Sequence, residues 1–268
     1  MELPQLSSDQ LDHWLNEQAT PWGRIRYRVV QHNLRYHLRY SLNEYPMRIL
    51  DAGGGNGRDS LPFAAEGHEV TLVDSSNEML AQARSTAQEQ GLQDRFQTIH
   101  ADIRDLPRLF PSPTFDLVLC HNVIQYTADP IACLSKVIAP LTLGGRLSLI
   151  SLNRYSEAYH AAFLRNDLEE ALAKLDARSL PSTLFSTDMK VYGSDEIINL
   201  LPQVGLSLEG QYGVRCLFDY WGDNAKKSDP ETYDKLEKLE IALSSRFPYK
   251  LLARAFHLIA RNDGLAEE

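Results

Sequence analysis

Residues 47–60 read M-R-I-L-D-A-G-G-G-N-G-R-D-S and set the architecture of this chain. A short apolar run ends in an acid, Asp51, and passes through four glycines within five residues before apolar residues return at helical spacing. This order predicts a strand, a tight turn and the start of a helix. Glycine suits such a turn because it tolerates backbone angles that other residues resist, and because a ligand can approach a main chain that has no Cβ atoms. The turn therefore predicts a site for a nucleotide-like cofactor.

The spacing of the glycines separates two kinds of cofactor. A dinucleotide fingerprint requires G-x-G-x-x-G, and from Gly53 and Gly55 its third glycine would fall at position 58, which is Arg58. What is present is D-x-G-x-G-x-G, from Asp51 through Gly53 and Gly55 to Gly57. This pattern argues against an NAD-dependent dehydrogenase, and on its own it leaves open a glycine-rich loop without a ligand.

Length and charge bound the class of protein. The chain has 268 residues, which is enough for one large α/β domain with a sizeable core and short for two independent domains. Its formal net charge is −9 and its pI is about 5.4, so the overall basic character of a nucleic-acid-binding protein is missing. Any basic surface must be local. The sequence leaves the oligomeric state open.

Cysteine usage and the N-terminus indicate the compartment. Cys120, Cys133 and Cys216 are scattered without C-x-x-C spacing, which predicts neither a disulfide framework nor a zinc site, and no metal is expected. The first ten residues lack the basic and apolar regions of a signal peptide, and no apolar run reaches about 18 residues. These features predict a cytoplasmic protein that is not inserted into a membrane.

The second predicted strand ends in an acid, as the first does. Residues 69–74, E-V-T-L-V-D, read as a buried parallel strand that ends in Asp74, about 20 residues past the first glycine. An acid at this place can accept hydrogen bonds from the two ribose hydroxyls of an adenosine-containing cofactor. Ser75 or Ser76 is then expected to cap the following helix.

Three further strands follow. Residues 96–103 predict a strand ending at Asp102, which is also a candidate cap for a helix or turn. Residues 115–126, F-D-L-V-L-C-H-N-V-I-Q-Y, predict the next strand and its exit loop, and 141–153 predict a turn and a fifth strand. Ligands of parallel sheets lie beyond the carboxyl ends of the strands, so His121 is expected at the cleft, either as a base or as part of the pocket wall.

Together these landmarks resemble the class I S-adenosylmethionine (SAM) methyltransferases over roughly residues 45–153. The resemblance implies SAM as cofactor and a Rossmann-like α/β fold. Its seven-stranded, mostly parallel sheet has helices on both faces, and residues 206–212 and 255–261 supply the last two strands, the final one antiparallel. It also implies a set of cofactor-binding residues, namely Arg26, Asp51, Gly53, Gly55, Gly57, Asp74, Ser75, Asp102, the backbone amide of Ile103, and His121.

On this reading the chain is a single methyltransferase domain, residues 1–268, in four parts. These are an N-terminal helical lid (1–44), the SAM-binding core (45–153), a substrate-side insertion after the fifth strand (154–192) and the C-terminal part of the sheet (193–268). Within the insertion, residues 155–177 are expected to be helical and 179–190 to form a polar, proline-containing loop.

The N-terminal part is a basic and aromatic island in an acidic protein. Residues 7–44 read as helical with a break near Thr20-Pro21, and the second segment interleaves five arginines with Trp and Tyr. It is either a solvated helix packed beside the sheet or a lid over the cofactor. In the second case its arginines, Arg26 first, meet the carboxylate of SAM or of an anionic substrate.

A closer resemblance extends over nearly the whole chain. The turn L-D-A-G-G-G-N-G, the stretch Y-G-V-R-C-L-F-D-Y at 212–220 and A-F-H-L-I-A-R at 255–261 are similar to the bacterial tRNA 5-carboxymethoxyuridine methyltransferases. This resemblance implies methyl-ester formation on the carboxylate of a modified wobble uridine in tRNA. It makes Arg215 the candidate cation for the anionic substrate, with Tyr220 stacking or hydrogen bonding beside it and His121 in the pocket.

Other interpretations stay open. Arg215 is also placed to form a structural ion pair with Asp219, four residues on. The tract of the insertion that is lysine-rich in the tRNA-specific relatives carries few cations in this chain, Lys174, Arg178 and Lys190. An anionic small molecule is therefore an alternative acceptor for an O- or N-methyltransferase. A SAM-binding protein without turnover is a third possibility, since no obvious base is present.

Overall fold

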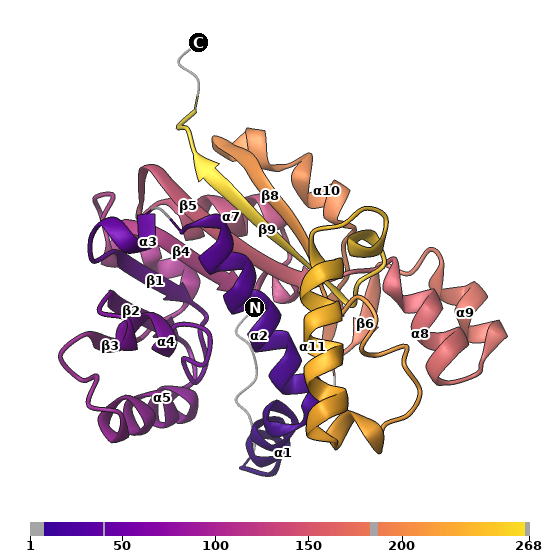
Figure 1. The fold of residues 1–268 in the computed structure, drawn as a ribbon. Coiled ribbons are helices and arrows are strands. Elements are labelled where there is room, and N and C mark those ends of the chain that lie inside the picture. The colour runs from indigo at the N-terminus through magenta and orange to yellow at the C-terminus, as the bar shows by residue number, and fades with distance from the viewer. Residues whose placement is uncertain (1–7, 40, 183–186, 266–268) are drawn as a thin grey trace.

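The computed structural model describes residues 8–39, 41–182 and 187–265, and a seven-stranded sheet runs through its centre (Figure 1). The strand order is β3-β2-β1-β4-β5-β9-β8. The strands are β1 (Arg48–Ala52), β2 (Glu69–Asp74), β3 (Phe96–His100), β4 (Phe115–His121), β5 (Leu141–Leu152), β8 (Leu206–Val214) and β9 (Ala255–Asn262).

The first five strands are parallel, and β9 pairs antiparallel with both β5 and β8. This confirms the predicted mostly parallel sheet with an antiparallel final strand. The central strands read as apolar runs because helices bury both faces of the sheet; in β4 all residues but Asp116 are buried. The carboxyl ends of β1, β4, β5 and β8 meet at one edge, and the functional residues lie there.

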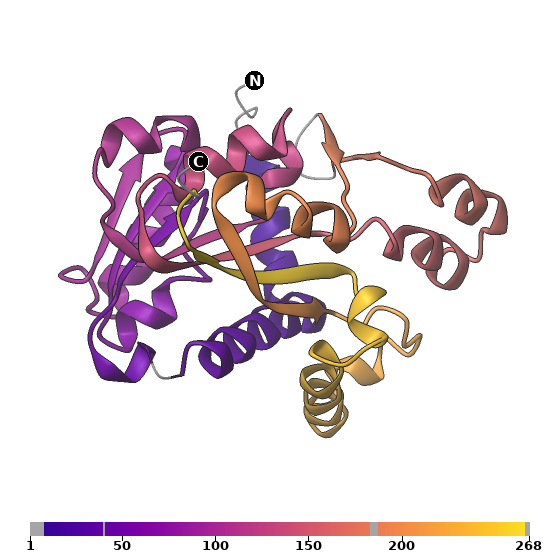
Figure 2. The ribbon, with the colours of Figure 1, turned by 90° about the horizontal axis from the view of Figure 1, so that it is seen from above.

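Helices lie on both faces of the sheet (Figure 2), and a hydrophobic cluster fills the space under each layer of helices. The first lies under α2 (Pro21–His37), α4 (Leu61–Ala65), α5 (Asn77–Glu89) and α11 (Pro230–Ser244). The second lies under α6 (Leu106–Leu109), α7 (Pro130–Ile138), α10 (Ser194–Ile198) and the 3-10 helix η3 (Leu201–Val204). The remaining 3-10 helices are η1 (Ile103–Asp105), η2 (Ile124–Tyr126), η4 (Lys226–Ser228) and η5 (Tyr249–Leu251).

The N-terminal segment is helical with a break where the sequence predicts one. Its helices are α1 (Ser8–Ala19), α2 and the short α3 (Ser41–Glu44), while residue 7 of the predicted segment lies outside the described residues. Thr20 caps α2 by accepting the backbone N–H of Gly23 at 3.1 Å, and Pro21 follows at the first helical position. Figure 1 shows α2 lying beside α11, and Arg28 of α2 pairs with Glu237 of α11 at 3.0 Å.

The insertion departs from its prediction in two ways. The expected helix over 155–177 is divided into α8 (Ser156–Leu164) and α9 (Leu168–Lys174), because Asn166 has a left-handed backbone (φ 52°) and Asp167 caps the second helix. The expected loop over 179–190 is an antiparallel pair, β6 (Ser179–Pro181) and β7 (Asp188–Lys190), on either side of residues 183–186, which are outside the described residues.

One local prediction is confirmed and another is corrected. Of the two serines expected to cap α5, Ser76 does so, and its Oγ accepts the N–H of Met79 at 3.2 Å. Strand β3, expected to end at Asp102, ends at His100, because Asp102 already caps η1. None of the helices in the described part of the chain is both long and apolar enough to cross a membrane.

Candidate functional site

The glycine-rich turn leaves β1 in a conformation that only glycine holds easily. Gly53, Gly55 and Gly57 have φ of 72°, 56° and 75°. A Cβ at Gly57 would lie 2.9 Å from the Phe96 ring, and one at Gly54 would lie 2.3 Å from the carboxyl of Asp51. The turn thus packs tightly against the sheet on one side and closes around Asp51 on the other.

Asp51, the penultimate residue of β1, is fully buried and is the main unexplained polar group of the site. Neither of its carboxyl oxygens has a hydrogen-bond partner within the described residues. Burial raises the pKa of Asp51 to about 7, and the carboxylates of Asp59 and Asp74 act in the same direction. A buried carboxyl with no partner fits a site that receives a cationic group, as the ammonium of SAM would supply.

Asp74, at the end of β2, faces the same turn. Its Oδ2 accepts the backbone N–H of Gly55 at 2.9 Å, and its Oδ1 accepts that of Ser76 at 2.8 Å. Burial raises the pKa of Asp74 despite these bonds. Each carboxylate oxygen can accept a further bond, so this position fits the predicted ribose acceptor. Ser75 beside it is exposed, and its carbonyl accepts from His100 at 2.9 Å.

Asp102 has the capping role that the sequence left open. Its Oδ1 accepts the N–H of Arg104 at 2.8 Å, and both carboxyl oxygens bond the Arg104 guanidinium, also at 2.8 Å. Hydrogen bonding to Arg104 lowers the pKa of Asp102. The neighbouring Ile103 begins η1. The predicted contact of Asp102 with the adenine amino group stays a prediction.

Helix α1, part of the segment predicted as a lid, lies against the glycine-rich turn through two residues that the sequence analysis did not name as site residues, Trp14 and Gln18. Cη2 of Trp14 lies 3.7 Å from the position of a Cβ at Gly55. The Gln18 side-chain oxygen accepts from Asn56 at 3.0 Å and from Arg58 at 3.3 Å, while its buried nitrogen has no partner among the described residues. Trp14 and Gln18 are four residues apart, so they share one face of α1, and this spacing was the only sign of the contact in the sequence.

Arg26 comes from α2 to the same region, where Asp59 holds it. Its Nη1 contacts both carboxyl oxygens of Asp59, at 2.5 and 2.6 Å, and its guanidinium lies over the Tyr27 ring at 4.4 Å. Although burial opposes it, the charge of Arg26 keeps the pKa of Asp59 well below its usual range. Asp59 lies in the quoted stretch, but nothing in the sequence indicated that it pairs with Arg26.

His121, at the end of β4, has both ring nitrogens engaged. Its Nδ1 lies 2.9 Å from Asp59 Oδ2 and its Nε2 lies 2.8 Å from Ser148 Oγ, and the side chain is 3% exposed. Burial lowers the pKa of His121. A base must present a free nitrogen to its substrate, so this arrangement favours the predicted wall role over the predicted base.

A second group of residues follows β8 at the same edge of the sheet. Arg215 forms a hydrogen-bonded pair with Asp219, with Nε at 2.7 Å and Nη2 at 2.5 Å from Oδ1. Nε2 of His160 in α8 lies 3.2 Å from Asp219 Oδ2. Burial would raise the pKa of Asp219, but Arg215 and His160 outweigh it and hold the pKa at about 2. The structural ion pair considered from sequence is therefore present, and it leaves the Arg215 side chain 25% exposed.

Tyr220 packs among aromatic residues of α8. Its ring centroid lies 5.4 Å from that of His160 and 6.2 Å from those of Tyr159 and Phe163. Its hydroxyl donates to the carbonyl of Leu252 at 3.2 Å, and burial raises its pKa. Tyr220 thus forms the wall beside Arg215 as a neutral side chain.

Glu240 of α11 fixes the loop that carries Arg215, and the sequence analysis missed it. Its fully buried carboxylate accepts the N–H groups of Cys216, Leu217 and Phe218 at 2.8, 2.7 and 2.5 Å. Arg215 itself has a left-handed backbone (φ 63°), a conformation that a non-glycine residue holds only when its surroundings enforce it.

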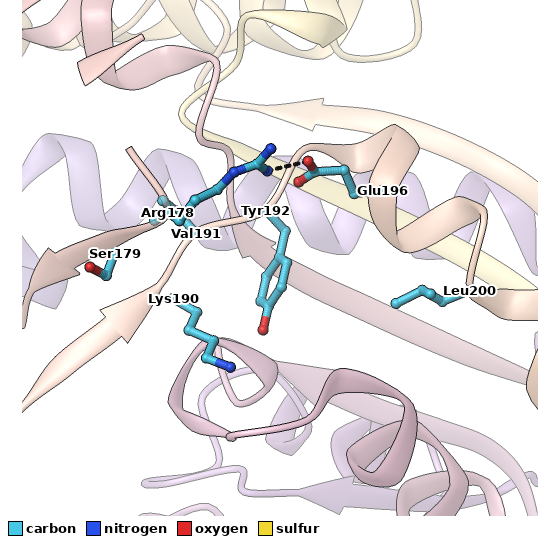
Figure 3. A pocket seen from close by; sticks show the side chains of 7 residues that line it. All are labelled: Arg178, Ser179, Lys190, Val191, Tyr192, Glu196 and Leu200. Atoms are coloured by element: carbon cyan, nitrogen blue, oxygen red, sulfur yellow. Dashed lines mark hydrogen bonds and ion pairs between the residues drawn. The ribbon is translucent and has the colours of Figure 1, made fainter. Parts of the chain in front are cut away.

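A pocket of about 530 Å³ lies between β7 and α10, away from the residues above (Figure 3). Its cations are Arg178, which pairs with Glu196, and Lys190, which donates to the carbonyl of Ala128. The Tyr192 hydroxyl is buried without a partner among the described residues. Two of the cations of the insertion therefore line one pocket. The described residues hold no group of three or more His, Cys, Asp or Glu side chains placed to bind a metal ion.

Comparisons with known proteins agree with this geometry. A methyltransferase-domain family model matches residues 44–199. The chain is 30% identical to the tRNA 5-carboxymethoxyuridine methyltransferase of Escherichia coli K12, over 92% of this chain and 91% of that protein. It is 30% identical to a ubiquinone biosynthesis O-methyltransferase of Xylella fastidiosa 9a5c, over 68% and 69%. The magnesium protoporphyrin IX methyltransferase of Synechocystis with bound S-adenosylhomocysteine has the same fold, with a TM-score of 0.62, 17% identity, and 95% of each chain covered.

The residues present fit the cofactor that these relatives imply. The unpartnered Asp51 carboxyl faces a turn whose glycines leave the main chain open, and Asp74 lies at the end of the adjacent strand. The family model covers more than half of the chain, and the match to the tRNA enzyme extends over nearly all of it. The chain belongs to the S-adenosylmethionine-dependent methyltransferases.

Proposed function

We propose that this enzyme methylates a carboxylate on a modified wobble uridine of tRNA, converting 5-carboxymethoxyuridine to its methyl ester. The observation that carries the proposal is Arg215, a partly exposed cation at the substrate edge of the sheet, within a chain that aligns almost end to end with a tRNA 5-carboxymethoxyuridine methyltransferase. Tyr220 beside it supplies an aromatic wall for a base.

The proposed cofactor contacts are those that the family resemblance implies, and the positions of the residues at the strand ends support them. Asp51 receives the ammonium group of SAM, Arg26 receives its carboxylate, and Asp74 accepts from the ribose hydroxyls. Asp102 and the amide of Ile103 meet the adenine, next to Ser75. His121 belongs to the pocket wall, since Asp59 and Ser148 occupy its nitrogens.

The proposed chemistry requires little from the protein beyond placement. SAM supplies a methyl group on a positively charged sulfur, and a carboxylate oxygen of the substrate displaces that sulfur. A carboxylate is ionised at neutral pH, so no base has to remove a proton. Arg215 orients the carboxylate, and the aromatic side chains around Tyr220 exclude water, so that alignment contributes most of the acceleration.

The pocket between β7 and α10 is proposed to contact the RNA backbone. Arg178 is 63% exposed at its side chain, and Lys190 is exposed as well. Both come from the insertion. This part of the insertion lies near the carboxyl ends of β4 and β5, because β7 contacts η2, which follows β4, and Tyr192 forms a bridge with Asn153, which follows β5. Phosphate contacts of this kind supply most of the affinity of proteins for nucleic acids.

A small-molecule O-methyltransferase is the second candidate. It is favoured by the 30% identity to ubiquinone biosynthesis O-methyltransferases over about two thirds of the chain, and by the acidic overall charge. In that case the acceptor would be a hydroxyl, which must lose a proton. A base other than His121 would be needed, because both ring nitrogens of His121 are already hydrogen bonded.

The deciding experiment measures methyl transfer from labelled SAM into two acceptors. These are bulk tRNA from a strain lacking this protein, and the small-molecule fraction of the same cells. Label in tRNA that mild alkali releases is the expected result, because methyl esters hydrolyse under these conditions and methylated bases do not. Label in the small-molecule fraction alone would overturn the tRNA proposal in favour of the second candidate.

A further inference from the structure

A chain of four buried polar side chains runs through the sheet from the cofactor edge. Asp59 follows β1, His121 ends β4, Ser148 lies in β5 and His257 lies in β9. The links are 2.9 Å from Asp59 to His121, 2.8 Å from His121 to Ser148, and 2.9 Å from Ser148 to His257. All four residues are at most 8% exposed, and the proposed reaction uses none of them.

The chain has one favourable arrangement of protons. Asp59 is ionised beside Arg26, so Nδ1–H of His121 donates to it and Nε2 of His121 accepts from the Ser148 hydroxyl. Ser148 then accepts from Nε2–H of His257. Nδ1 of His257, which has no partner among the described residues, is left as a bare acceptor. The reverse direction would leave a buried N–H unpaired at that atom, which costs more.

The end of the chain is the guanidinium of Arg26. Asp59 engages Nη1 alone, and within the described residues it is the one hydrogen-bond acceptor that the structure records for Arg26. The pair is nearly buried, with side chains 14% and 11% exposed. Asp59 thus fixes Nη1 of the planar guanidinium and leaves Nη2 and Nε available to a ligand.

We propose that Asp59 is a positioning residue, held in place by His121, Ser148 and His257, which sets the Arg26 guanidinium for the carboxylate of the bound cofactor. The inference rests on the proposed contact between Arg26 and that carboxylate. It gives His121 a role that its occupied nitrogens allow, and it gives a role to the buried histidine of β9, His257.

The test compares two ligands that differ in the group concerned. S-adenosylhomocysteine carries the amino-acid carboxylate, and 5′-methylthioadenosine lacks the amino-acid portion. Asp59→Asn should lower the affinity for S-adenosylhomocysteine about tenfold, the usual order for a hydrogen bond to a charged group, and leave that for methylthioadenosine unchanged. Asp116→Asn is the matched control, because Asp116 pairs with Arg48 at the opposite end of the sheet.

Variants of His121 and Ser148 test the hydrogen-bonded side chains that hold Asp59. The quantity compared is the ratio of the affinity for S-adenosylhomocysteine to that for methylthioadenosine. His121→Asn retains a donor near the position of Nδ1 and should keep most of the wild-type ratio, whereas His121→Leu should lower it. Ser148→Ala, the smallest change, should lower the ratio in the same direction. Binding of methylthioadenosine by each variant shows that the nucleoside site is folded, so a general loss of structure is separated from a loss of positioning.

The outcomes distinguish this inference from the assignment it rests on. If Arg26→Ala leaves the ratio unchanged, the proposed contact of Arg26 with the carboxylate is wrong. If Arg26→Ala lowers the ratio but Asp59→Asn does not, positioning by Asp59 is wrong. A higher affinity of Asp59→Asn for S-adenosylhomocysteine would show that Asp59 competes with the cofactor for Arg26, and would also overturn the proposal.

Discussion

Arg215 and Asp219 form an ion pair in which the two partners have opposite exposures. The Asp219 side chain is 3% exposed and the Arg215 side chain 25%, with Nη2 2.5 Å from Oδ1. Asp219 is buried against His160. It therefore holds the Arg215 guanidinium on its buried side, while the other side of the guanidinium stays open to solvent. Such a pair fixes the direction of a cation that is to meet an anionic substrate.

Arg215→Ala is expected to reduce kcat/KM for the tRNA acceptor by about a hundredfold, because it removes the cation and leaves the buried Asp219 charge with His160 alone. The affinity for SAM should not change, since Arg215 lies outside the glycine-rich turn. Arg165→Ala, which breaks the exposed pair with Glu170 on the α8–α9 hairpin, is the control. Unchanged methylation of every anionic acceptor by Arg215→Ala would remove this residue from the substrate site.

Asp74→Ala is expected to weaken SAM binding by at least about tenfold. The substitution removes a charged acceptor for the ribose, and hydrogen bonds to charged groups contribute about 1.5–3 kcal/mol each. It also releases the N–H of Gly55, which Asp74 holds at 2.9 Å. Calorimetry measures the change, with the exposed Asp94→Ala as the control; equal affinities for the two variants would refute the placement of the ribose.

Much of the core was predictable because its signals are local. The strand ending in Asp51, the four glycines and the strand ending in Asp74 lie within 28 residues and follow from backbone geometry and apolar runs. Buried parallel strands such as β4 leave an apolar pattern that sequence alone reveals. The family resemblance then supplied the seven-stranded, mostly parallel sheet, and the structure confirms it with an antiparallel β9.

What the sequence did not reveal depends on contacts between distant residues. Arg26 and Asp59 are 33 positions apart, Glu240 is more than 20 positions from the N–H groups it accepts, and Gln18 meets the turn from a separate helix. The sequence around a glutamate on a helix does not show whether its carboxylate is buried and accepts hydrogen bonds from a loop or lies on the surface. The β6–β7 pair was missed for a related reason, since two three-residue strands are too short to show a period.

SAM binding is expected to strengthen as the pH rises from about 6 to about 8. Burial raises the pKa of Asp51 to about 7 in the empty site, so the carboxyl must lose a proton before it can pair with an ammonium group. Affinity should therefore rise by up to about tenfold per pH unit below that pKa and level off above it. The same raised pKa stabilises the empty fold at low pH, and this contribution is lost as the pH rises towards 7.

Proton release on binding checks that dependence directly. Calorimetry in buffers of different ionisation enthalpy should detect up to one proton released near pH 6, and none for Asp51→Asn. A pH-independent affinity in the wild-type enzyme would place the ammonium group away from Asp51.

Glu240→Ala is expected to lower the free energy of unfolding by at least about 3 kcal/mol, because three buried N–H groups lose their acceptor at about 1–3 kcal/mol each. The loop after β8 should also loosen, since Arg215 keeps its left-handed backbone only while that loop is anchored. Denaturant unfolding measures the first effect. The control on the same helix is Glu231→Ala, whose exposed pair with Lys235 contributes less than about 1 kcal/mol. Equal losses for the two variants would show that Glu240 is not the anchor.

Arg178→Ala and Lys190→Ala are each expected to weaken tRNA binding uniformly and to reduce its salt dependence. Every phosphate contact that is lost lowers the slope of log K against log salt concentration by roughly one, so the double variant should lose roughly two. Lys174→Ala is the matched control, because Lys174 belongs to the same insertion but does not line the pocket between β7 and α10. SAM affinity should be the same in all four variants. If Lys174→Ala lowers the slope as much as the pocket variants do, the insertion attracts RNA through its overall charge, and the pocket does not hold a particular phosphate.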